Sequence, residues 1–133
     1  MLRLAAIAAL AIALGAAGSA SATSFRTPSG LIYCSYQTGP KFLRCDTWYR
    51  TRFSGHKHCA MGDYGQAFGM RPHRRARVLC VSDSTFSEHA KVLRYGHKRR
   101  FGPFRCWSER TGLTCLNRGG HGWGLSRAAQ SVF

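Results

Sequence analysis

The chain has 133 residues, and its 20 lysines and arginines against five acidic residues give a formal net charge of +15. This length leaves room for one small domain, which excludes a multidomain architecture and leaves a core too modest to be stable easily without further support. The charge favours anionic partners such as nucleic acid, phospholipid, teichoic acid or lipopolysaccharide, although a high net charge also keeps an exported protein soluble. Most of the basic residues are Arg, whose planar guanidinium matches phosphate and carboxylate groups.

The N-terminal segment, residues 1–22, has the order of a secretory signal peptide. A basic start that includes Arg3 precedes an apolar stretch, residues 4–17, and small residues then lead to Ala22 in an A-x-A pattern. This order predicts cleavage between Ala22 and Thr23. The apolar stretch is shorter than the roughly 20 residues of a membrane span, so we expect no transmembrane span after cleavage, with an uncleaved anchor as the alternative.

The predicted mature domain, residues 23–133, keeps 19 basic and five acidic residues and therefore a net charge of +14. We expect this domain to be secreted or periplasmic and monomeric. All six cysteines lie in it, which is typical of a disulfide framework in a small exported chain. They are Cys34, Cys45, Cys59, Cys80, Cys106 and Cys115.

The first predicted strands form a hairpin. Residues 31–36 and 42–49 are rich in aromatic and apolar side chains, and Gly39-Pro40 breaks the run between them. Folding about this break places Cys34 opposite Cys45. Four more side chains are expected on the face of the two sulfurs, and these are Ile32, Tyr36, Leu43 and Thr47.

The middle of the chain gives weaker signals. Residues 54–69 contain many glycines and polar residues, which predicts mostly loop. Residues 76–81 are predicted to form a strand. Thr85 begins a sequence that resembles a capping box, and Gly96 is a typical helix stop, so this stretch permits one short helix.

A second hairpin is predicted near the C-terminus. Residues 104–108 and 113–116 flank a turn, and folding about Arg110-Thr111 sets Cys106 opposite Cys115. Directly opposed residues in an antiparallel pair bring their Cβ atoms about 4.5–5.5 Å apart, close to what a disulfide tolerates.

The two local pairs leave Cys59 with Cys80. The predicted disulfides are therefore Cys34–Cys45, Cys59–Cys80 and Cys106–Cys115. Each bridge stabilises a small domain by roughly 3 kcal/mol, mostly by restricting the unfolded chain. Trp123 and Leu125 alternate as in a last strand. The predicted fold is mainly β, a small disulfide-stapled antiparallel sandwich or barrel with at most one short helix.

Taken together, these segments resemble a family of small exported bacterial proteins classed only as a domain of unknown function. The resemblance covers nearly the whole mature chain, with Leu31 as a departure, because the family pattern usually carries Asn there. It implies export and the cysteine framework, and it implies no reaction. The matching pieces are Phe25-x-Thr27-Pro28-Ser29-Gly30-x-Ile32-x-Cys34, Arg44-Cys45-Asp46, Gly62-Asp63-Tyr64-Gly65, Leu79-Cys80-Val81-Ser82-Asp83, Leu93-Arg94-Tyr95-Gly96, Phe104-Arg105-Cys106, Gly112-Leu113-Thr114-Cys115 and Gly120-His121-Gly122-Trp123-Gly124-Leu125-Ser126-Arg127.

The clustering of His56, His58 and Cys59 suggests a zinc site, which His73 and Cys80 would complete. Export favours oxidised cysteines, and use of Cys59 and Cys80 as ligands would disrupt the disulfide framework. We therefore expect no metal and no other cofactor.

A secreted ribonuclease or phosphodiesterase is an alternative function. Such an enzyme needs a general acid, a general base and a cation near the transition state. His121, His89 or Glu88, and Arg127 are the candidates, but no motif fixes their mutual geometry. The competing interpretation, which we favour, is that His121 packs in a glycine-shaped turn and that the protein is not an enzyme.

Two basic clusters carry the strongest partner signal, and both are expected in turn-rich chain beside aromatic residues. Tyr95, Phe101 and Trp107 are candidates to stack on a ligand, although Trp107, beside a disulfide, is expected in the core. The expected partners are anionic envelope polymers or lipid surfaces, not a specific nucleic-acid sequence. A solvated surface and a protein-binding structural module that uses a β edge are the alternatives. The predicted anion-binding residues are Arg71, Arg74, Arg75, Arg77, Lys98, Arg99 and Arg100.

Overall fold

The computed structural model describes residues 21–133, and within this range the chain forms strands and no helix. No helix long and apolar enough to cross a membrane occurs among these residues. The predicted signal peptide lies, apart from its last two residues, outside the described residues. The strands are β1 (Ala22–Arg26), β2 (Ile32–Gln37), β3 (Phe42–Thr47), β4 (Asp63–Met70), β5 (Arg77–Val81), β6 (Lys91–Val92), β7 (Lys98–Phe101), β8 (Phe104–Glu109), β9 (Gly112–Leu116), β10 (Gly122–Leu125) and β11 (Gln130–Val132).

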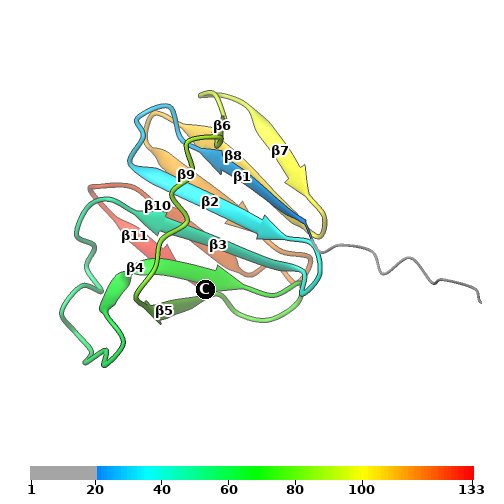
Figure 1. Ribbon diagram of the computed structural model, residues 1–133. Coiled ribbons are helices and arrows are strands. Elements are labelled where there is room, and N and C mark those ends of the chain that lie inside the picture. The colour runs from blue at the N-terminus through cyan, green and yellow to red at the C-terminus, as the bar shows by residue number, and fades with distance from the viewer. Residues whose placement is uncertain (1–20) are drawn as a thin grey trace, which may run out of the picture.

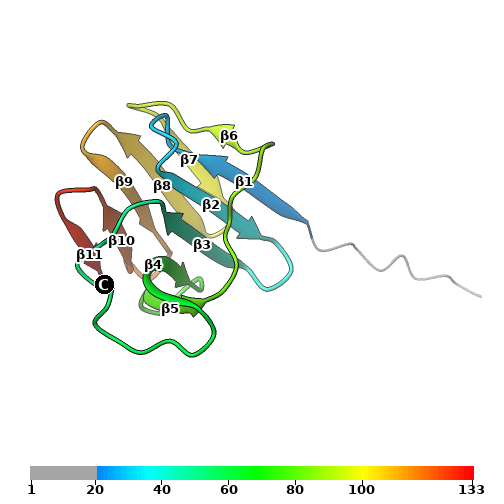
Figure 2. The ribbon, with the colours of Figure 1, turned by 60° about the vertical axis from the view of Figure 1, so that its left-hand side comes forward.

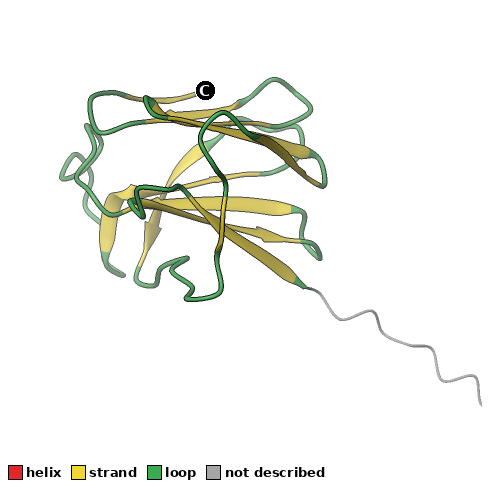
Figure 3. Cartoon of the chain, turned by 90° about the horizontal axis from the view of Figure 1, so that it is seen from above, coloured by secondary structure: helices red, strands yellow, loops and turns green. Residues whose placement is uncertain are grey.

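The strands form two sheets that pack face to face, as Figure 3 shows from above. Sheet A has the order β5-β4-β3-β2-β1-β6, and sheet B has the order β11-β10-β9-β8-β7. All neighbours are antiparallel except β1 and β6. Figure 1 views the sandwich face-on, with β8 and β9 behind β1 and β2, and Figure 2 views it obliquely. The predicted mainly-β class is confirmed, in the sandwich form.

The first predicted hairpin is β2–β3. Cys34 pairs with Cys45 in the ladder, and their disulfide spans a Cα–Cα distance of 4.0 Å. Both sulfur-bearing residues are fully buried. The side chains predicted on the same face are buried as well, which confirms the register, and they are Ile32, Tyr36, Leu43 and Thr47.

The second predicted hairpin is β8–β9, which repeats this arrangement in sheet B. Cys106 pairs with Cys115, and the two form a disulfide with a Cα–Cα distance of 4.1 Å. The third disulfide joins Cys59, in the loop before β4, to Cys80 in β5. All three predicted pairings are confirmed. The four cysteines of these two hairpin disulfides belong to the core cluster. Each of the two disulfides therefore points from its own sheet towards the opposite sheet.

Aromatic side chains fill the space between the sheets. The rings of Phe25 in β1 and Phe101 in β7 stack with their centroids 4.3 Å apart. At the other side of the sandwich, Phe68 in β4 meets Trp123 in β10, with centroids 6.4 Å apart. Full burial of a Phe stabilises a fold by roughly 2 to 3 kcal/mol, so these contacts bind one layer to the other.

The prediction of a loop for residues 54–69 was wrong for the second half of this segment, where β4 forms. Glycines made this segment resemble a loop, but one of them serves packing within the sheet. A Cβ atom on Gly69 would lie within 3 Å of both the Phe42 ring and the Leu79 side chain. Only glycine therefore allows these neighbours to cover the strand.

The short helix predicted as possible between Thr85 and Gly96 does not form. Residues 82–90 instead run as a strap across the outer face of sheet A, from β5 towards β6 (Figure 1). The Thr85 amide donates to Asp46 at 2.9 Å, and its hydroxyl donates to the Tyr33 carbonyl at 2.8 Å. The residue that resembled a helix cap is therefore used to hold the strap on the sheet.

Candidate functional site

The predicted anion-binding residues occupy two places in the fold, and all are exposed. Three of them lie in the β4–β5 loop, and Arg77 is the first residue of β5. Lys98, Arg99 and Arg100 lie in β7, an edge strand of sheet B. The expectation that this second cluster sits in turn-rich chain was therefore wrong, because a strand presents these cations at fixed spacing. The three in the loop are Arg71, Arg74 and Arg75.

The β7–β8 ladder of sheet B brings three exposed cations and the partly exposed Trp107 together. Lys98 pairs with Trp107, and Arg100 pairs with Arg105. Since Phe104, Cys106 and Ser108 of β8 are buried, the alternation of the strand places Arg105 and Trp107 on its outer face. A hollow of about 280 Å³ is formed by these four residues and Arg99. These five residues are called the β7–β8 basic face below: Lys98, Arg99, Arg100, Arg105 and Trp107.

Trp107 contributes an aromatic surface to the β7–β8 basic face. It is partly exposed, and the Lys98 ammonium lies 5.8 Å from the centre of its ring. The expectation of a core position was wrong, because the neighbouring Cys106 and Ser108 are buried and the alternation of the strand turns Trp107 outward. A partly exposed indole among cations offers a ligand both stacking and charge.

No carboxylate among residues 21–133 forms an ion pair with the β7–β8 basic face. Both ion pairs of this range belong to Arg44 in sheet A, which contacts Asp46 and Asp83 at 2.8 Å each. The hydrogen bond from Arg44 lowers the pKa of Asp83. Two of the five acidic residues are thus engaged on the other sheet, and the like charges of Arg100 and Arg105 remain opposed.

Asn117 connects the other basic cluster to sheet B. Its buried amide donates to the carbonyls of Arg71 and Arg74 at 2.8 and 2.7 Å. The amide oxygen accepts from the backbone of Gly119 and His121 at 2.9 and 3.0 Å. One side chain therefore shapes both the β4–β5 loop and the β9–β10 loop.

The two basic clusters lie at one end of the sandwich. The β9–β10 loop carries the exposed Arg118, whose amide donates to the Pro72 carbonyl at 3.0 Å. Leu116, just before this loop, pairs with Arg105 of the β7–β8 basic face. Sequence reasoning missed Arg105, Arg118 and Asn117. The alternation of buried and exposed positions in residues 104–108 was the signal that places Arg105 outward.

A family model described as a family of unknown function (DUF6636) matches residues 4–133. The chain belongs to DUF6636. The resemblance drawn from the sequence is confirmed to this extent, with six cysteines present. No curated protein matches the DUF6636 chain, and no solved structure does. Its three disulfides fit an extracytoplasmic protein.

The candidate residues for phosphodiester hydrolysis do not meet in the DUF6636 chain. His121 directly precedes β10 and Arg127 follows it, so the strand separates the two. His89 and Glu88 lie in the strap on the outer face of the other sheet. His121 sits in the Asn117-bound turn, in agreement with the structural role favoured for it.

The candidate zinc ligands do not form a metal site either. Cys59 and Cys80 form a disulfide and offer no thiolate. Among residues 21–133, no group of three or more His, Cys, Asp or Glu side chains is arranged to hold a metal ion.

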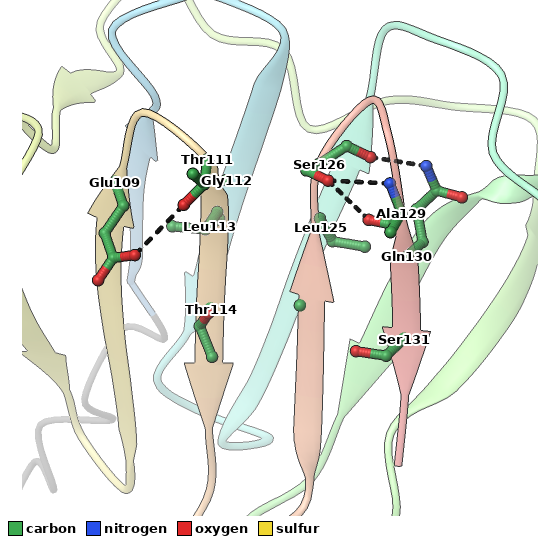
Figure 4. Close-up of a pocket in the computed structure, with 11 residues that line it drawn as sticks. Glu109, Thr111, Gly112, Leu113, Thr114, Leu125, Ser126, Ala129, Gln130 and Ser131 are labelled. Atoms are coloured by element: carbon green, nitrogen blue, oxygen red, sulfur yellow. Dashed lines mark hydrogen bonds between the residues drawn. The ribbon is translucent and has the colours of Figure 1, made fainter.

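A shallow groove lies at the opposite end of sheet B, beside the β8–β9 and β10–β11 turns (Figure 4). It has a volume of about 260 Å³. Ser126 closes the β10–β11 turn by accepting from the Ala129 amide at 3.0 Å, and the Ser126 carbonyl accepts from the Gln130 side chain at 2.6 Å. The Thr111 hydroxyl donates to Glu109 at 3.3 Å. These polar groups are engaged with one another.

Proposed function

We propose that this protein is an exported, non-enzymatic module that binds an anionic polymer of the cell envelope. The binding surface is the β7–β8 basic face together with the β4–β5 loop. The predicted signal peptide and the three disulfides support the location, because disulfides persist outside the cytosol.

The opposition of Arg100 and Arg105 is the observation that carries the proposal. Directly opposed residues in an antiparallel pair have Cβ atoms about 4.5 to 5.5 Å apart, and like charges at this position destabilise the sheet. A bound phosphate or carboxylate between the two guanidiniums removes the repulsion and accepts hydrogen bonds from both. The pair is thus better suited to an anion-bound state than to a free one.

The spacing of the cations favours an extended polymer over a single small ion. Strands lie about 4.8 Å apart, so β7 and β9 are separated by about 10 Å across the sheet. Arg118 then follows β9, and the β4–β5 loop is hydrogen-bonded to its backbone. A flexible chain with regularly repeated anionic groups contacts several of these cations at once.

The proposed binding is mainly electrostatic. Each anionic group that an Arg or Lys binds releases counterions, so affinity falls as salt rises and depends little on the sequence of the polymer. Trp107 adds an apolar surface on which a sugar or glycerol unit packs. No bond is made or broken, and no catalytic residue is required.

Three of the four edge strands disfavour the alternative of a partner strand added to a β edge, and only β5, with five residues and one cation, stays open to it. Edge strand β7 carries three consecutive cations, and β6 and β11 have only two and three residues. Charged or very short edges are devices that prevent strand addition.

Binding of purified wall teichoic acid, measured by calorimetry over a salt series, tests the proposal. The double variant Arg100→Gln/Arg105→Gln is compared with Arg50→Gln/Arg52→Gln, which removes the same charge from the exposed β3–β4 loop. We expect the first variant to lose at least tenfold in affinity and to reduce the salt slope by about two, roughly one for each cation removed.

The control variant is expected to lose much less affinity. Equal losses in both variants would mean that net charge alone attracts the polymer. Absence of wild-type binding at every salt concentration would end the proposal.

A further inference from the structure

A hollow with a mostly apolar lining lies at the end of the sandwich opposite the β4–β5 loop. It has a volume of about 510 Å³, within the range of about 300 to 1,000 Å³ that is typical of small-molecule sites. The β1–β2 turn of sheet A forms one wall, and the β8–β9 and β10–β11 turns of sheet B form the other. The cavity therefore opens between the two layers.

The interior of this cavity is apolar, and its rim is basic. Ile32 and Leu125, which belong to the buried core, form part of the lining. Arg110 and Arg127 line it as well and are exposed. The Arg110 guanidinium lies 5.1 Å from the centre of the Tyr95 ring, which holds it at the rim.

Tyr49 also lines the cavity, and its hydroxyl has no hydrogen-bond partner although it is buried. An unsatisfied buried hydroxyl is unfavourable, and an acceptor on a ligand that reaches it would remove this cost. Burial raises the pKa of Tyr49 to about 12, while the Arg127 guanidinium opposes part of the rise. At neutral pH the hydroxyl therefore keeps its proton and can donate only to an acceptor that enters its buried surroundings.

We infer that this cavity binds a small organic anion with an apolar body. The body packs against Ile32 and Leu125, and the acidic group is held at the rim by Arg127 and Arg110. The only acidic side chain in the lining, Glu109, accepts a hydrogen bond from Thr111, so an anionic ligand meets an excess of positive charge.

This site is separate from the proposed polymer-binding surface. Arg105 lies near the first residue of β8, whereas Glu109 is the last residue of the same strand. The Arg100–Arg105 pair and the cavity thus lie towards opposite ends of β8, and a change at one leaves the charges of the other in place.

Fluorescence titration with anilinonaphthalene sulfonate tests the inference, since this dye has an apolar body and one acidic group. The uncharged analogue phenylnaphthylamine measures the contribution of the apolar body to binding without that of the acidic group. We expect Arg127→Gln to weaken binding of the sulfonate at least tenfold, because the variant cannot form the charge-assisted hydrogen bond, and to leave binding of the uncharged dye unchanged. Tyr49→Phe is expected to reduce the affinity for the sulfonate dye severalfold.

Two controls make the result specific. Arg52→Gln removes a charge from the nearby β3–β4 loop, outside the cavity, and Arg100→Gln/Arg105→Gln removes the proposed polymer site. Both are expected to bind the sulfonate like the wild type. Near-ultraviolet circular dichroism checks that each variant is folded, since partly unfolded proteins also bind the dye.

Equal sulfonate affinity in wild type and folded Arg127→Gln and Tyr49→Phe would overturn the inference. Weakening by Arg52→Gln as strong as by Arg127→Gln would overturn it as well. If Arg127→Gln does not fold, Arg110→Gln takes its place with the same expected selectivity for the charged dye.

Discussion

Arg100 and Arg105 lie directly opposite each other in the β7–β8 ladder, and neither forms an ion pair within residues 21–133. In a chain with 20 basic and five acidic residues, few carboxylates remain to separate such charges. The fold keeps this repulsive pair in a regular strand, where the spacing of the two guanidiniums is fixed. This is the arrangement from which the proposed anion binding follows.

Removing one charge of this pair should stabilise the free protein. We expect Arg105→Thr to raise the free energy of unfolding by about 0.5 kcal/mol at low salt, because the substitution removes the repulsion between opposed like charges. Added salt should reduce the gain, since it screens the repulsion. Urea unfolding at two salt concentrations measures both effects. A decrease in stability at low salt, larger than that of Arg50→Thr, would contradict this prediction.

Asn117 should matter for stability and for polymer binding at once. Asn117→Ala removes four hydrogen bonds from a buried site, and we expect the free energy of unfolding to fall by about 2 to 3 kcal/mol. Polymer affinity should also fall, although no charge is removed, because Arg71 and Arg74 lose their fixed positions. Calorimetry on the folded variant measures this, with the exposed Gln37→Ala as control. Unchanged affinity would show that loop geometry is irrelevant to binding.

The disulfides should differ in their resistance to reduction. Cys34–Cys45 and Cys106–Cys115 are fully buried in the native state, whereas both partners of Cys59–Cys80 are partly exposed. Mild reductant should therefore open Cys59–Cys80 first and leave the other two intact until the sheets separate. Alkylation followed by mass spectrometry identifies the order. Early reduction of either buried pair would be incompatible with this burial.

The hairpins and disulfides followed from the sequence because both depend on short-range pairing. In each hairpin the turn position and the period of two set Cys opposite Cys, and the third pair remained by elimination. Strands β1, β4, β7 and the strap could not be obtained in this way. Gly69 resembles a loop residue until the Phe42 ring covers it, and Thr85 resembles a helix cap until Asp46 and Tyr33 accept its hydrogen bonds.

The candidate site was predicted in part for the same reason. Charge clusters are visible in the sequence, so Arg71 and Arg100 were identified. Their connection through Asn117 depends on contacts between segments far apart in the chain. Arg105 was missed although it faces Arg100 across a short hairpin, because β7 was not predicted as a strand. The outward position of Trp107 was missed because its place beside the buried Cys106 suggested burial, whereas adjacent residues of a strand point to opposite faces.

Stability should fall in alkaline solution in a way that depends on Tyr49. Burial raises its pKa in the folded protein from 10.0 to about 12. Between these values the unfolded state has lost the proton and the folded state keeps it, so stability is fully present below pH 10 and decreases as pH rises towards 12. Tyr49→Phe should lose less stability across this interval. Chemical unfolding at several pH values measures the difference, and identical pH dependence of the two proteins would show that Tyr49 is not responsible.

Chemical-shift mapping of the oxidised, isotope-labelled protein during titration with wall teichoic acid locates the polymer-binding surface residue by residue. We predict that the Trp107 indole N–H and the amides of Lys98, Arg100 and Arg105 shift first, and that these shifts disappear at high salt. Signals from Tyr49 and Arg127, at the other end of the sandwich, should remain in place. Shifts spread evenly over all exposed basic residues, or confined to the end that holds Arg127, would contradict binding at the β7–β8 basic face.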